Sequence, residues 1–177
     1  CMTNRPNTVT KKERQAEATL EAIKKDLQQH KAHVAKVMSV LEESKKRWFP
    51  NLNQRTAQIA SILQHCFLPR SRQSEMDAAF CYEFTMLMHR LNVPQFSSLT
   101  LFDKLFSDIT PCFIAFTEYE TTIYARYIFK ALSKMQAWHN DEKLYVKEAH
   151  EVVGFQKNWS AVPTPVEKED LLSYNDF

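Results

Sequence analysis

Residues 10–48 carry one long helical pattern, and this pattern constrains the fold more than any other feature of the chain. A capping box between Thr10 and Glu13 opens the pattern, because each side chain can bond to the backbone amide of the other residue. Pro50 follows the pattern, and proline cannot continue a helix. At about 1.5 Å per residue, the predicted helix is roughly 55–60 Å long. We therefore predict one long, charged helix over residues 10–48.

Apolar residues recur along this helix at alternating spacings of three and four, which is the heptad pattern of a helix that packs along one seam. His30 and Ser44 occupy the two gaps in the pattern. Such a seam needs a partner, and the sequence leaves two open: a later helix of the same chain, or another protein. The predicted seam consists of Leu20, Ile23, Leu27, Val34, Val37, Leu41 and Trp48.

Proline, serine and threonine residues divide the rest of the chain into shorter helices. Pro69 is expected to end one helix, and Pro111 to kink or split another. Thr117 begins a second capping box. Phe155 and Trp159 are expected to pack onto the helices from an irregular segment. The expected helices are 53–67, then 76–91 after Ser71 or Ser74, then 99–109 capped by Ser97 and Ser98, 117–139, 141–151, and a last one that begins near Pro165.

Short paired helices, two of them apolar on nearly every face and therefore buried, predict an all-α fold. We interpret the pairing as an irregular α-solenoid of the HEAT or armadillo kind, although no repeat of fixed length is present. The single glycine, Gly154, argues against hairpins with glycine turns, phosphate-binding loops and dinucleotide fingerprints. The predicted organisation is a disordered linker over 1–9, the long helix over 10–48, and a helical solenoid segment over 51–177 that is truncated at its C-terminal end.

No arrangement of residues predicts catalysis or a bound cofactor. A zinc site made from His65, Cys66, Cys81, His89 and Cys112 is conceivable, but the close ligand pairs typical of zinc fingers are absent. The cysteines within apolar helical runs are expected to be buried thiols, and burial opposes the thiolate that nucleophilic catalysis needs. We therefore expect neither an enzyme nor a small-molecule substrate. No segment approaches the roughly 18 consecutive apolar residues of a membrane helix, so no membrane contact is expected either.

Basic residues form several short clusters, although the net charge of +2 is too small to indicate nucleic-acid binding by itself. Acidic residues alternate with these clusters on the long helix, which weakens their field. Three interpretations stay open: a solvated charged face, an auxiliary RNA contact, or a surface for an acidic protein. The candidate contacts are Lys24, Lys25, Lys45, Lys46, Arg47, Arg70 and Arg72.

The order of residues over 62–108 is more specific than a generic helical pattern, and it resembles the THO complex subunit 2 family. The resemblance extends over about 11–150 and is weaker from there to the end of the chain. Pro111 departs from the family pattern, in which an unbroken helix is expected. The matching residues are the run Leu63–Arg70, Ser74, Asp77, Ala78, Phe80, Cys81, Phe84, His89, the run Pro94–Leu99, Asp103, the run Phe106–Ile109, Thr117, Glu118, Tyr124, Arg126, Tyr127, Trp138 and His139.

The resemblance implies a structural scaffold that acts by binding proteins. Members of this family form the elongated helical subunit of the nuclear THO complex, which contributes to mRNP assembly and mRNA export. The implied partners are other THO subunits, the DEAD-box RNA helicase of the TREX assembly and, through them, RNA. The basic tail that is associated with RNA binding in the family is not among these residues, so an RNA role inferred from that tail does not transfer.

Overall fold

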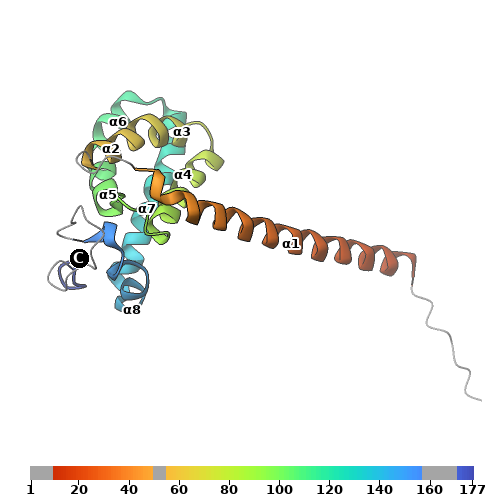
Figure 1. Ribbon diagram of the computed structural model, residues 1–177. Helices are drawn as coiled ribbons and strands as arrows, with labels where there is room; N and C mark the ends of the chain where they lie inside the picture. Colours follow the sequence, from red (N-terminus) through yellow and green to blue (C-terminus); the bar gives the residue numbers. More distant parts are fainter. Residues whose placement is uncertain (1–9, 50–54, 157–170) are drawn as a thin grey trace, which may run out of the picture. The chain divides into compact units, whose positions relative to one another are not determined.

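The computed structural model describes residues 10–49, 55–156 and 171–177, and every regular element in these ranges is a helix (Figure 1). The prediction of an all-α fold is therefore confirmed, while the finer prediction of an α-solenoid stays a prediction. The chain forms two compact units, residues 1–44 and residues 45–177, which we describe separately. The expected linker over 1–9, Trp159 and the helix expected near Pro165 lie outside the described residues.

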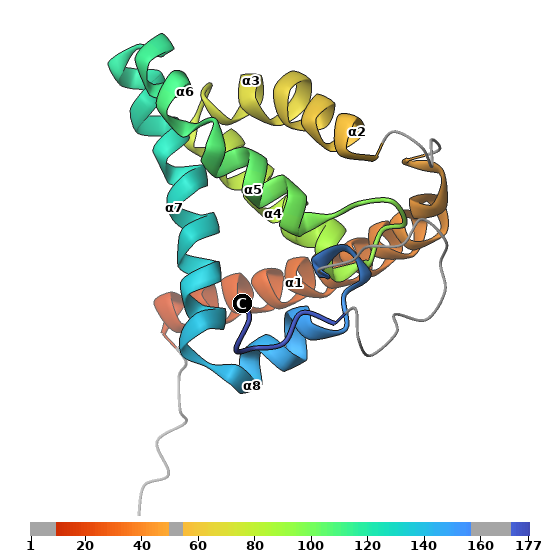
Figure 2. The same ribbon diagram turned by 90° about the vertical axis from the view of Figure 1, so that its left-hand side faces the viewer.

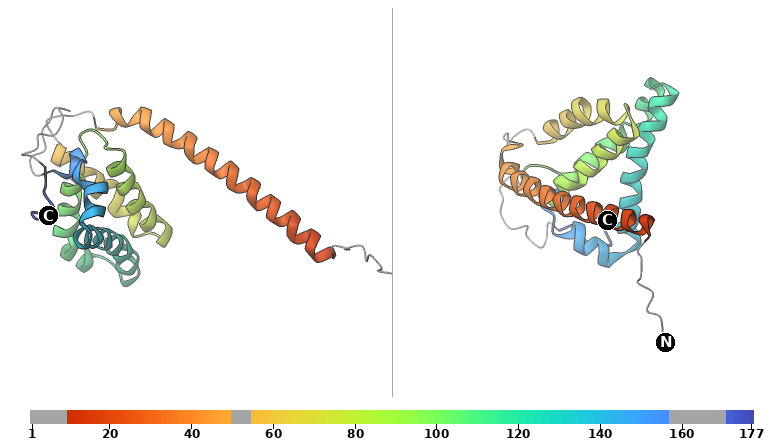
Figure 3. Two further views of the ribbon diagram at one scale, coloured as in Figure 1. Left: turned by 90° about the horizontal axis from the view of Figure 1, so that it is seen from below. Right: turned by 90° about the vertical axis from the view of Figure 1, so that its right-hand side faces the viewer.

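The first unit contains a single described element, the 34-residue helix α1 (Lys11–Ser44), which Figure 3 shows as one continuous helix. The predicted capping box is present. The Glu13 carboxylate accepts a hydrogen bond of 2.5 Å from the Thr10 amide, and the Thr10 hydroxyl accepts one of 3.3 Å from the Glu13 amide. These bonds satisfy amides that have no partner within the helix.

The α-helix ends at Ser44, so the prediction that it reaches Trp48 is wrong. The Ser44 hydroxyl donates to the carbonyl of Leu41 (3.2 Å), a side-chain bond that competes with continued helical pairing. The next residues form the 3₁₀ helix η1 (Lys45–Arg47), which belongs to the second unit. Tertiary contacts of that unit, including a ring stack made by Trp48, replace the last turn expected from the sequence.

The prediction that Pro69 ends a helix at 67 is also wrong. The helix continues through the proline as three contiguous segments, namely α2 (Arg55–Ile62), the π-helix η3 (Leu63–Phe67) and α3 (Leu68–Ser71). In the π-helical turn the Leu68 amide donates to the carbonyl of Leu63, five residues earlier. This wider turn relieves the clash between a proline ring and the preceding carbonyl. The chain turns instead at Arg72 and Gln73.

The remaining helices of the second unit begin close to the residues predicted as caps. The Ser74 hydroxyl accepts from the Asp77 amide, and the Ser97 hydroxyl accepts from the Thr100 amide, each at 3.1 Å. The predicted split at Pro111 is confirmed, because Pro111 lies in the first turn of a separate short helix. The helices are α4 (Glu75–Arg90), α5 (Ser98–Ser107), α6 (Ile109–Ala115), α7 (Glu118–Asn140), α8 (Glu142–Tyr145), the π-helix η4 (Val146–His150) and the 3₁₀ helix η5 (Val153–Phe155).

Helix α7 organises the second unit and runs from α6 at one end to α8 at the other (Figure 2). It packs along α4, and the Tyr127 side chain lies at the centre of the contact. The Tyr127 hydroxyl is 3.2 Å from the Thr85 hydroxyl, and its ring meets Phe67 edge to face at 6.4 Å. Buried aromatic rings such as these contribute most of the apolar area in a core of this size.

A second cluster of buried rings holds the described C-terminal residues against α7 and α8. Phe155 is fully buried there, as predicted, and lies 5.3 Å from the Trp138 ring. The amide group of Gln156 bridges the chain, because its oxygen accepts from the Leu172 amide at 2.7 Å. The Tyr145 hydroxyl donates to the carbonyl of Leu172 at 2.8 Å. Residues 171–177 are thus part of the second unit.

Two expectations about burial are wrong. Helix α4 is not buried all round, because Met76 is 80% exposed and Phe80 is 45% exposed. Cys66 is exposed, whereas Cys81 is buried as expected and Cys112 is half-buried. Both errors have one cause: an apolar residue type indicates the capacity for burial, but the neighbouring helices determine which face is covered.

Candidate protein-binding surfaces

The first candidate surface is the apolar seam of α1. In the described part of the first unit there is no second element, and no residue of α1 is buried. Leu41 is half-buried, and Trp48 lies beyond α1, in the second unit, so that its place in the seam stays a prediction. Val40, which the heptad interpretation missed, is 56% exposed and widens the apolar stripe toward the C-terminal end of α1. The other seam residues are exposed as follows: Leu20 52%, Ile23 61%, Leu27 51%, Val34 43% and Val37 40%.

The predicted basic contacts are divided between the two units, and they stay a prediction. Lys24 pairs with Glu21 (3.2 Å) and, like the exposed Lys25, lies on α1. Lys45 donates to the carbonyl of Leu91 (2.8 Å) at the C-terminal end of α4. The negative end of the helix dipole favours a cation at this position.

The basic residues of the second unit differ in whether they form an ion pair with a carboxylate. Arg70 pairs with Asp77 at 2.9 Å. Arg72 pairs with Glu120 at 3.4 Å. Lys46 and Arg47 are exposed, and they lie next to an apolar groove.

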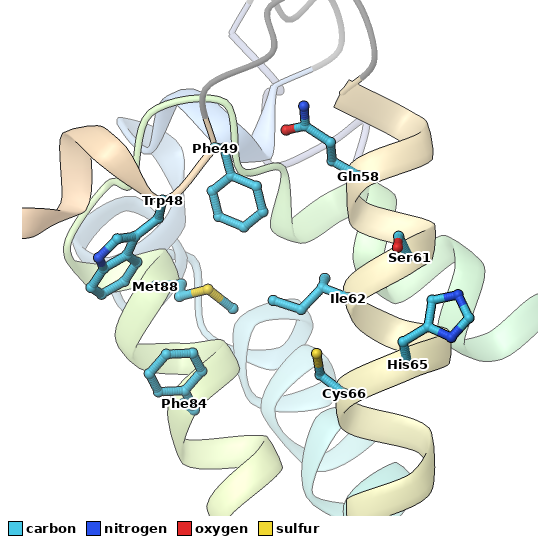
Figure 4. A pocket seen from close by; sticks show the side chains of 9 residues that line it. All are labelled: Trp48, Phe49, Gln58, Ser61, Ile62, His65, Cys66, Phe84 and Met88. Carbon is cyan, nitrogen blue, oxygen red and sulfur yellow. The ribbon is translucent and has the colours of Figure 1, made fainter.

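That groove is the second candidate surface, and Figure 4 shows its lining side chains. It has a volume of about 630 Å³. One wall is formed by α2 and η3, and the other by α4. The side chains of Phe49, Ile62 and Met88 lie across the groove from one another. The lining residues are Trp48, Phe49, Gln58, Ser61, Ile62, His65, Cys66, Phe84 and Met88.

A ladder of stacked rings supports the α4 wall of this groove. Trp48 stacks on Phe84 (6.0 Å between ring centroids), and Phe84 stacks on Phe80 (5.7 Å). The Arg70 guanidinium lies 4.1 Å above the Phe80 ring, a cation–π contact that closes the ladder. Trp48 was predicted to belong to a heptad seam, and nothing in the periodicity of residues 10–48 indicates its role in this ladder.

The buried side chain of His89 is bonded within the core. Its Nε2 lies 2.9 Å from the Glu148 carbonyl and its Nδ1 lies 2.7 Å from the Ser98 hydroxyl. A carbonyl only accepts, so Nε2 carries the hydrogen and Nδ1 accepts from Ser98. Burial lowers the pKa of His89, although the Glu148 carbonyl favours the charged form. With both nitrogens engaged inside the core, this imidazole is not placed to act as a general base.

Two of the described thiols, Cys81 and Cys112, are not activated either. Burial raises the pKa of Cys81 to about 11, and burial also raises the pKa of Cys112. A thiol with a raised pKa stays protonated at neutral pH and is a poor nucleophile. Among the described residues there is no group of three or more His, Cys, Asp or Glu side chains that could hold a metal ion. None of the described helices is both long and apolar enough to span a membrane.

The described residues form an all-α module with two apolar surfaces, namely the seam of α1 and the groove between α2 and α4. The profile of the Tho2 family, described as transcription factor/nuclear export subunit protein 2, matches residues 2–177. The chain belongs to this family.

Curated relatives agree with the family match over most of this chain. It is 30% identical to THO complex subunit 2 of Dasypus novemcinctus over 97% of its length. It is 33% identical to the human THO complex subunit 2 over 89% and 28% identical to that of Arabidopsis thaliana over 86%. The chain spans only 9–11% of the length of these relatives. No solved structure matches the chain.

Proposed function

We propose that this chain is a structural scaffold segment of a THO complex and that it acts by binding proteins, not by catalysis. Support comes from the family match over residues 2–177 and from relatives that are named THO complex subunit 2. On this proposal the chain works in the nucleus, in mRNP assembly and mRNA export. The proposed partners are other THO subunits and the DEAD-box RNA helicase of the TREX assembly.

The observation that most strongly supports a binding role is the exposed seam of α1. Leu20, Ile23 and Leu27 are each more than half exposed on one side of the helix. Exposed apolar side chains in a heptad pattern gain free energy when a second helix covers them. We propose that a helix of another THO subunit covers this seam.

Direct RNA contact is the alternative proposal, and it has weaker support. Arg70 and Arg72 already pair with carboxylates of the second unit, and Lys45 is bonded to a backbone carbonyl. The affinity for RNA grows with the number of protein cations on one face, because each contact with a phosphate releases counterions from the RNA. If RNA binds, Lys46 and Arg47 are the best candidates among the proposed residues of the second unit.

Co-purification with the recombinant THO subunits and the helicase tests the proposal. We expect the 177-residue chain to be retained by at least one of them. The double substitution Leu27→Asp and Val34→Asp should abolish retention, because a buried seam cannot accommodate unpaired carboxylates. The matched control is Gln28→Asp with Ala35→Asp, which adds the same charge to α1 outside the seam and should leave retention unchanged. Retention by none of these proteins, or equal retention of both double variants, contradicts the proposal.

A further inference from the structure

The groove between α2 and α4 is an apolar surface that the seam of α1 does not explain. We propose that this groove binds an acidic amphipathic helix of a protein partner. The inference rests on the proposed scaffold function and deepens it, because it gives the chemistry of one partner.

The shape of the groove fits a helix. One wall presents Gln58, Ile62 and Cys66, which follow one another at single-turn spacing on α2 and η3. The other wall presents Phe84 and Met88, also one turn apart on α4. When two antiparallel or crossing helices point apolar side chains into a common groove, a third helix can bind there. The bound helix contacts the groove through its residues i, i+3, i+4 and i+7. The volume of about 630 Å³ is enough for several such side chains.

The walls are held in place without a ligand. Phe49 stacks on Phe96 at 5.9 Å, and Trp48 stacks on Phe84 at 6.0 Å. The hydrogen bond from Lys45 to the Leu91 carbonyl fixes the turn that precedes both rings. A preformed site of this kind loses less conformational entropy when a partner binds.

The charge at the groove favours an acidic partner. None of the described residues that line it is Asp or Glu. The exposed cations Lys46 and Arg47 immediately precede Trp48, which lines the groove. An acidic residue on the flank of a docking helix would face positive charge at this end of the groove.

The same features favour a protein over RNA. Single-stranded RNA binds mainly through bases stacked on free aromatic faces. Phe84 is already stacked with both Trp48 and Phe80, and Phe49 is stacked on Phe96. Ile62 and Met88 add aliphatic side chains to the lining, which the apolar side chains of a helix match better than nucleobases do.

Alkylation of Cys66 in the full 177-residue chain tests the proposal, because this thiol is exposed within the groove. The probe is a synthetic amphipathic helix of about 16 residues, roughly 24 Å long, with leucines on one face and glutamates beside them. A peptide of the same composition in scrambled order and a peptide with lysine in place of glutamate are the controls. Cys112, which lies outside the groove, is the internal standard.

We expect the acidic helix to slow alkylation of Cys66 about tenfold at a concentration about ten times its Kd, with Cys112 unchanged. Both control peptides should leave Cys66 unprotected. The charge reversals Lys46→Glu and Arg47→Glu should weaken protection by the acidic helix and permit protection by the lysine peptide. The matched control reverses Lys143 and Lys147, which are exposed and do not line the groove, and should behave like the wild type.

Three outcomes overturn the proposal: protection by no peptide, protection by a single-stranded RNA instead of the acidic helix, or protection that rises with the concentration of the chain alone. The last outcome would assign the groove to a second copy of the chain. If the chain co-purifies with THO subunits while the peptide gives no protection, only this inference fails. If the peptide protects Cys66 but no THO subunit retains the chain, the proposed function fails instead.

Discussion

At the scale of single residues, the sequence predicts which side chains are suited to a role but not the contacts that give them that role. Phe155 was expected to pack onto the helices, and it does so completely. Trp48 was assigned to a seam, because its spacing fits the heptad pattern. Its actual contact with Phe84 joins residues that are distant in sequence, and a local pattern holds no information about such a pair.

Gly154 shows the same limit for a residue without a side chain. A Cβ at this position would lie 2.1 Å from the carbonyl oxygen of Phe96. The glycine is therefore required because two backbone segments approach closely. The presence of a single glycine in the sequence was informative about the class of fold. The contact that requires a glycine at this position appears only in the structure.

We predict that His89 makes stability depend on pH. Its pKa is lowered by burial in the folded chain, so below about pH 6.5 the unfolded chain binds a proton more readily. Stability should therefore fall as the pH drops below that value toward the folded pKa. Around the ring, the Glu148 carbonyl and carboxylate favour the charged form, while Lys134 and Arg90 oppose it.

The variant His89→Gln, which has no titrating ring, isolates this effect. Urea unfolding at pH 7 and pH 5 should show a smaller difference in the free energy of unfolding for the variant than for the wild type. The exposed His139 provides the control, because His139→Gln should keep the wild-type difference. Equal pH dependence in the wild type and His89→Gln would contradict the prediction.

At the scale of elements, the capping residues were the most reliable guide. Thr10, Ser74, Ser97 and Thr117 each cap the helix expected from the sequence, because a cap is a contact between residues three positions apart. Helix ends without such a local contact were predicted poorly. Pro69 lies inside a helix, because a π-helical turn and the packing around Phe67 accommodate its ring.

Removal of the Thr117 cap should destabilise the second unit modestly. In Thr117→Ala the Glu120 amide loses its partner at the start of α7, which costs about 1 kcal/mol. Thr122 supplies a matched control, because its hydroxyl donates to the carbonyl of Glu118 within the helix and caps nothing. Chemical denaturation should place Thr117→Ala below both the wild type and Thr122→Ala. A variant as stable as the control would show that the cap contributes no stability.

At the scale of the whole molecule, the all-α class followed from periodicity, whereas the groove did not. The groove consists of residues from three segments, represented by Trp48, Ile62 and Phe84, and only the tertiary fold brings them together. The seam of α1 stays a prediction, and it could be made from the sequence because its residues from Leu20 to Leu41 lie on one helix. The division of the chain at Ser44 could not be predicted, because the pattern of apolar residues continues past this residue.

Residues 45–177 should fold without the long helix, because they contain the buried aromatic clusters around Tyr127 and Trp138. We expect this fragment to unfold cooperatively, at nearly the same denaturant concentration as the 177-residue chain. Circular dichroism of both proteins during urea titration would measure this. A fragment that lacks a cooperative transition would show that α1 is required for the core.

Hydrogen exchange of α1 tests the central claim, that the chain serves as a binding scaffold, most directly. The measurement compares the amides of residues 20–41 in the free chain and in the chain assembled with THO subunits. We predict rapid exchange in the free chain, because helix α1 has no buried residue, and much slower exchange after assembly, because a partner helix covers the seam. Exchange at the same rate in both states would contradict the account.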